Sequence, residues 1–72
     1  MNESQQILFM QIRILRMMAE RNSISLKQAA EIFGKYNVLT FIREGFGIFH
    51  VEGDEADFDE VKTYLQSKGA AV

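Results

Sequence analysis

The chain of 72 residues contains no cysteine and no proline, and it carries a single histidine. Without cysteine, a disulfide framework and a thiolate zinc site are both excluded, and the cytoplasm is the expected compartment. The sequence also has no glycine-rich phosphate loop and no serine-nucleophile elbow, which are two common frameworks for catalysis. We therefore expect a protein that is not an enzyme and that needs neither a cofactor nor a metal.

Long apolar runs are absent as well. No stretch approaches the roughly 20 uninterrupted apolar residues that a membrane-spanning helix requires. The N-terminal segment does not read as a secretion signal, because Arg13, Arg16 and Arg21 interrupt its only apolar stretch. The sequence therefore predicts a soluble protein that makes no membrane contact.

The net charge of the chain is only -2, and it is unevenly distributed. Residues 1–50 carry six basic and four acidic side chains, a sum of +2, whereas residues 51–72 carry two and six, a sum of -4. An acidic total argues against a dedicated nucleic-acid binder, since such proteins neutralise phosphates with lysine and arginine. A hydrophobic fraction of 47% is that of a folding chain, and this length supports one core, so residues 1–72 are predicted to form a single domain.

Apolar residues recur at helical spacing over about residues 3–21, which predicts a first helix. A second helix is predicted after Ser25, because its hydroxyl and the side chain of Gln28 have the spacing of a capping box. Residues 34–37 are predicted to form the turn that follows. The apolar stripe expected on the second helix consists of Leu26, Ala29, Ala30 and Phe33.

A third helix is predicted over about residues 38–50. Gly45 and Gly47 weaken a helix, so residues 46–51 also allow a strand, and the helical interpretation is favoured. The side of this helix expected to be buried carries Leu39, Phe41, Ile42, Phe46, Ile48 and Phe49.

The last helix is predicted to begin at Asp57, with Glu60 completing a capping-box-like start, and to run to Lys68 before Gly69. The acidic stretch 52–57 is predicted to be a connector. Together these segments predict an all-α fold, a compact four-helix single domain with a helix-turn-helix-like central hairpin.

Residues 25–46 have the order of a DNA-binding helix-turn-helix, which gives a DNA-binding regulator as the alternative function. The second helix of this pair offers chiefly apolar side chains, however, where base recognition needs Arg, Asn or Gln. A clustered basic surface would favour nucleic acid and scattered charges would favour protein contact. The side chains that decide between the two are Arg13, Arg16, Arg21, Lys27 and Arg43.

His50 is followed closely by Glu52, Asp54 and Glu55, and imidazole with carboxylates can bind a divalent cation. The competing interpretation is that His50 contacts carbonyl groups at the end of the third helix, while the acidic residues favour the start of the fourth. The sequence leaves open whether this acidic segment binds a metal or a basic partner.

The first helix supplies the main functional signal, because its apolar arc covers more than half of its circumference. Methionine adapts well to contact surfaces, and an apolar band beyond the needs of the core marks a partner site. The alternative is a central helix that the other three pack around. The predicted function is a non-catalytic protein-binding module, either a homodimer or an accessory partner. The predicted contact residues are Phe9, Met10, Arg13, Met17 and Arg43.

Two short patterns, Phe41-Ile42-x-Glu44 and His50-x-Glu52-Gly53-Asp54-Glu55, lie within a longer resemblance over about residues 5–66. On these patterns the chain resembles a family of small, helical bacterial proteins of unknown function. Some members of that family are encoded beside genes for toxins of the ADP-ribosyltransferase type. The resemblance thus implies an antitoxin or accessory role, without assigning an activity to any residue.

Overall fold

The computed structural model describes residues 1–72 and contains four helices and no strand. The helices are α1 (Glu3–Arg21), α2 (Leu26–Lys35), α3 (Val38–Phe49) and α4 (Asp54–Ser67). The prediction of an all-α, four-helix fold is confirmed, and residues 46–49 are helical rather than extended. None of the helices has both the length and the apolar character needed to cross a membrane.

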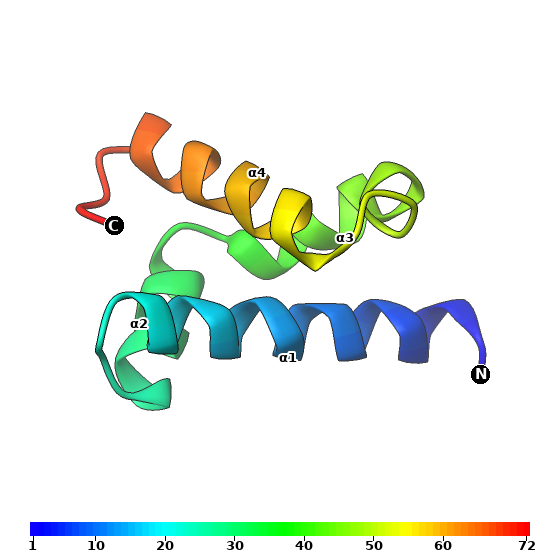
Figure 1. The fold of residues 1–72 in the computed structure, drawn as a ribbon, viewed down its shortest axis with the longest axis horizontal. Helices are drawn as coiled ribbons and strands as arrows, with labels where there is room; N and C mark the ends of the chain where they lie inside the picture. The colour runs from blue at the N-terminus through cyan, green and yellow to red at the C-terminus, as the bar shows by residue number, and fades with distance from the viewer.

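Helix α1 is the central packing element, because it contacts α2, α3 and α4. Figure 1 shows α1 along one side of the molecule and α4 along the opposite side, with α2 beside the C-terminal end of α1. Helix α3 also packs against both α2 and α4. The buried apolar side chains between the helices are Met10, Ile14, Met18, Ala19, Ala29, Phe33, Val38, Ile42, Phe46, Phe49, Phe58, Val61 and Leu65.

Capping boxes begin the first two helices. The predicted box at α2 is confirmed: the Gln28 N–H donates to Ser25 Oγ at 3.0 Å, and the Ser25 N–H donates to Gln28 Oε1 at 2.9 Å. A second box, formed by Asn2 and Gln5, begins α1 with distances of 3.2 and 2.9 Å. Each box satisfies two backbone N–H groups that the helix itself leaves without acceptors.

Replacing Ser25 with alanine is expected to lower the free energy of unfolding by about 1 kcal/mol, because the cap oxygen that accepts from the Gln28 N–H is lost. Urea denaturation followed by circular dichroism measures the change. Ser4→Ala, at an exposed position inside α1, is the matched control and is expected to cost nothing. Equal losses in the two variants would contradict a capping role for Ser25.

The predicted capping residue of the last helix is wrong by four residues, because Gly53 and not Asp57 occupies that position. Helix α4 begins at Asp54, and Gly53 precedes it with φ +93°, a backbone conformation that glycine adopts without strain. Asp57 is therefore inside the first turn, where its side chain is buried with 1% of its surface exposed. Carboxylates anywhere in a first turn interact favourably with the helix dipole, so several starting points fitted this acidic segment equally well.

The predicted buried faces of α2 and α3 are too wide. Helix α3 packs inward through Val38, Ile42, Phe46 and Phe49, which follow one another at intervals of four, four and three residues. Leu39 and Ile48 lie on its flanks and are exposed, as is Leu26 at the start of α2. Only Ala29 and Phe33 are fully buried on α2. A narrow inward stripe leaves several large apolar side chains at the surface.

Candidate functional site

Three of the five predicted contact residues, Phe9, Met10 and Arg13, line one shallow groove between α1 and the end of α3, together with Phe46 and His50. Phe9 is 46% exposed and belongs to the surface. Met10 is only 3% exposed and belongs to the core, so it offers little area to a partner. The groove is small, with a volume of about 340 Å³.

The other two predicted contact residues lie elsewhere. Met17 is half-buried and packs against the core, whereas Arg43 is exposed on α3 and does not line this groove. Phe9, Met10 and Arg13 thus share a groove that Met17 and Arg43 do not line, and their role as contact residues stays a prediction.

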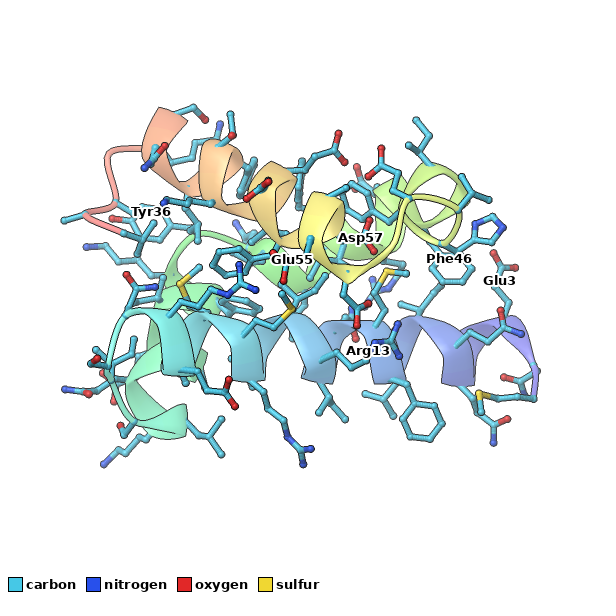
Figure 2. The ribbon with its side chains drawn as sticks, in the orientation of Figure 1. Glu3, Arg13, Tyr36, Phe46, Glu55 and Asp57 are labelled. Atoms are coloured by element: carbon cyan, nitrogen blue, oxygen red, sulfur yellow. The ribbon has the colours of Figure 1, made fainter.

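Two arginines of α1 are engaged by carboxylates at the start of α4. Arg13 Nε lies 3.2 Å from Asp54 Oδ1, and the Arg21 guanidinium pairs with Glu55. Figure 2 shows Arg13 and Glu55 in the space where the two helices face each other. The hydrogen bond with Glu55 raises the pKa of Arg21, and the same bond lowers the pKa of Glu55.

These ion pairs reduce the basic surface that DNA binding would need, because Arg13 and Arg21 belong to the five side chains that decide that question. Helix α3, the second helix of the predicted DNA-binding pair, also buries Ile42 and Phe46. DNA binding by residues 25–46 stays a prediction without a free basic cluster to support it.

The larger concave surface is a groove between α3 and α4, with a volume of about 610 Å³. We call it the α3–α4 groove. Its apolar side chains are Phe41, Ile48, Phe49 and Tyr64, and its polar lining consists of Asp59, Glu60, Thr63 and Ser67. Gly45 also lines the groove, next to the Phe49 ring. Ile48 is 63% exposed, although it is one of the largest aliphatic side chains of the protein.

The aromatic floor of the α3–α4 groove is fixed by its own contacts. The rings of Phe41 and Tyr64 stack with centroids 4.1 Å apart, and Phe49 lies against Phe41 at 5.6 Å in a tilted arrangement. The Tyr64 hydroxyl donates to the carbonyl oxygen of Tyr36 at 2.7 Å, which ties α4 to the end of α2. The floor is thus ordered before any ligand arrives.

Gly45 lets the Phe49 ring lie close to the backbone of α3. A β-carbon built at this position would lie 3.0 Å from two ring atoms of Phe49, a contact tight enough that the ring would have to shift by a few tenths of an ångström. By sequence alone, this glycine indicates a weakened helix. In the folded protein it shapes the aromatic floor of the α3–α4 groove.

An acidic cluster lies beside the same groove and consists of Glu52, Asp57 and Glu60. Asp57 is almost fully buried, and its Oδ1 has no hydrogen-bond partner. Burial, the hydrogen bond with Glu52 and the nearby negative charges together raise the pKa of Asp57 to about 6, with burial the largest cause. Desolvation and the contact with Glu52 also raise the pKa of Glu60. No basic side chain forms an ion pair with any of the three.

His50 contacts a carbonyl group at the end of α3, as the competing interpretation of this residue predicted. Its Nδ1 lies 2.8 Å from the carbonyl oxygen of Phe46, and its ring stacks on the Phe46 ring with centroids 5.1 Å apart. No three His, Cys, Asp or Glu side chains converge in a way that could hold a metal ion.

The α3–α4 groove was not predicted, although the helical spacing of its lining residues is present in the sequence. Phe41, Gly45 and Ile48 follow the i, i+4, i+7 spacing of one helical face, and so do Glu60, Tyr64 and Ser67. The two faces meet only because α3 packs against α4, which a periodicity within one helix does not reveal.

The fold and its surfaces define a small all-α protein with three open surface pockets, of which the α3–α4 groove has the greatest volume. The family model described as Protein of unknown function (DUF3791) matches residues 9–68, and the chain belongs to this family. The match spans all four helices except the first turns of α1. No curated protein and no solved structure matches the chain significantly.

Proposed function

We propose that this protein is a non-catalytic protein-binding module and that the α3–α4 groove is its contact surface. The observation that carries the proposal is the uncovered apolar floor of this groove, in which Ile48 is exposed beside the stacked rings of Phe41 and Tyr64. Apolar concave surfaces of this kind accept helices of other proteins, with a few side chains inserted as anchors.

Two further features support binding of a helix. The floor is held by ring stacking and by the Tyr64 hydrogen bond, so little side-chain freedom is lost when a partner docks. The lining residues of α3 extend from Phe41 to Phe49, a length of about 12 Å at the helical rise, which matches roughly two turns of a partner helix.

The proposal is tested by placing a photoreactive benzophenone amino acid at position 48 and expressing the protein in its native cells. We expect irradiation to join the protein to one partner of defined mass, because Ile48 lies inside the groove. The same label at position 26 is the matched control, since Leu26 is similarly exposed but lies outside the α3–α4 groove. The recovered partner should then bind the unlabelled protein directly, and Ile48→Asp should weaken that binding at least about tenfold.

Crosslinking at equal yield from both positions, or direct binding that Ile48→Asp leaves unchanged, would overturn the groove assignment. The mass and identity of the crosslinked product also distinguish a homodimer from a complex with a different protein. A product of twice the mass of the chain would indicate a homodimer, and a toxin in the product would indicate a neutralising role. The toxin assignment is supported only by the family resemblance.

A further inference from the structure

The acidic side chains near the α3–α4 groove differ from those at the start of α4 in having no arginine or lysine partner. Asp54 and Glu55 are paired with Arg13 and Arg21 of α1. Glu60 lines the groove together with Asp59, and neither has a basic side chain within ion-pairing distance. The Lys68 ammonium group lies 5.6 Å from the centre of the Tyr64 ring, and Lys68 is not one of the residues that line the groove. The groove thus has an apolar floor and an acidic edge whose two carboxylates form no ion pair within the chain, although the charge of Asp59 acts on Arg21 over a longer distance.

Asp57 adds a second observation of the same kind. Its side chain is 1% exposed, its Oδ1 has no hydrogen-bond partner, and the charges of Glu52 and Glu60 act on it. A buried carboxyl group without a full set of partners is rare in native structures. A positive charge brought to Glu60, which lines the groove, would offset the repulsion that Glu60 exerts on the neighbouring Asp57.

We propose that the occupant of the α3–α4 groove is a basic amphipathic helix of a partner protein. Its apolar side chains, spaced i, i+4 and i+7, pack on Phe41, Ile48 and Tyr64, while its lysine or arginine side chains face Asp59 and Glu60. This inference rests on the proposed protein-binding function of the groove and adds the charge of the partner.

The same edge disfavours other occupants. An anionic membrane surface and the phosphates of DNA would be repelled by Asp59 and Glu60. A metal ion alone would need three converging ligands, and no such group is present. A basic amphipathic helix can pack apolar side chains on the floor and pair basic side chains with the acidic edge.

Two synthetic peptides of about 14 residues test the inference, both with the same leucine stripe at i, i+4 and i+7. One carries lysine beside the stripe, and the other carries glutamate at the same positions. Titration of each into the isotope-labelled full chain, followed by NMR, gives the dissociation constant and the residues whose signals shift. We expect the lysine peptide to bind at least about tenfold more tightly than the glutamate peptide and to shift the signals of Phe41, Ile48 and Thr63.

A change in salt concentration and the removal of single charges both test whether the carboxylates contribute to binding. Raising the salt from about 50 to about 500 mM should weaken the lysine peptide several-fold, because exposed charges are screened. Glu60→Gln and Asp59→Asn should each weaken it by about two- to fivefold, whereas Glu31→Gln, on the exposed side of α2, should have no effect.

The outcomes distinguish this inference from the proposed function. If both peptides bind in the groove with equal affinity and without salt dependence, the inferred charge of the partner is wrong, while groove binding stands. If the lysine peptide shifts only signals outside the groove, or if neither peptide shifts any, the inference is likewise overturned. The crosslinking at position 48 still decides the proposed function in those cases.

Discussion

Replacing Leu65 with alanine is expected to lower the free energy of unfolding by about 2–5 kcal/mol. Leu65 is fully buried at the C-terminal end of the inward face of α4, so alanine removes apolar contacts and leaves a cavity. A domain of this length has a total stability of about 4–11 kcal/mol, so the variant is expected to be partly unfolded at 37 °C. Urea denaturation at 25 °C, followed by circular dichroism, measures the loss.

Leu8→Ala is the matched control for this substitution. Leu8 has the same side chain but is 52% exposed on α1, so we expect its replacement to cost less than about 1 kcal/mol. A cost for Leu8→Ala that equals the cost for Leu65→Ala would show that the core does not have the composition described above.

Asp57→Asn is expected to raise the free energy of unfolding near pH 7.5 by up to about 3 kcal/mol. The pKa of Asp57 is about 6 in the folded protein and 3.8 in the absence of perturbation, and each pKa unit corresponds to about 1.4 kcal/mol. Asparagine has nearly the same shape and no charge, and its amide can donate to Glu52 as the protonated carboxyl does.

The pH dependence of the wild-type protein follows from the same shift. Because the folded pKa is the higher one, the favourable contribution of protonated Asp57 is complete below about pH 4 and is lost as the pH rises through 6. Lowering the pH from about 7.5 to about 5 should thus stabilise the protein by about 1.4 kcal/mol. The raised pKa of Glu60 acts in the same direction, and the lowered pKa of Glu55 acts only at more acidic pH.

Urea denaturation at both pH values measures this prediction. In Asp57→Asn the stabilisation on acidification should largely disappear, whereas Asp59→Asn, on the exposed side of α4, should retain it. The Asp57→Asn variant could instead keep the full pH dependence and lose stability near pH 7.5. That result would refute the claim that a buried negative charge at Asp57 destabilises the folded protein.

The helices could be predicted from the sequence because their signals are local. The Ser25 and Gln28 capping box, the apolar spacing of α1 and the absence of proline all act within a few residues, and each was interpreted correctly. The Asn2 and Gln5 box has the same three-residue spacing and was overlooked only because it precedes the apolar run. The start of α4 was misplaced because the stabilising acids fill several consecutive positions.

Surface exposure was predicted less well, because it depends on how helices pack rather than on spacing within one helix. Ile48 and Leu39 fit an apolar face of α3 by sequence, yet its inward stripe passes between them. Met10 is apolar and adaptable, properties that suit a contact surface and a core equally, and it lies in the core. The α3–α4 groove combines two such faces, so neither helix alone reveals it.

The central position of α1 has a consequence for folding during synthesis. Helix α1 leaves the ribosome before the helices that cover it, so the buried residues Ile14 and Met18 are covered only when α2, α3 and α4 have followed. At ordinary rates of translation, these 72 residues take about 4–14 s to make. During that interval the nascent helix carries an uncovered methionine-rich surface, and chaperones that recognise such surfaces are expected to bind it before α4 docks.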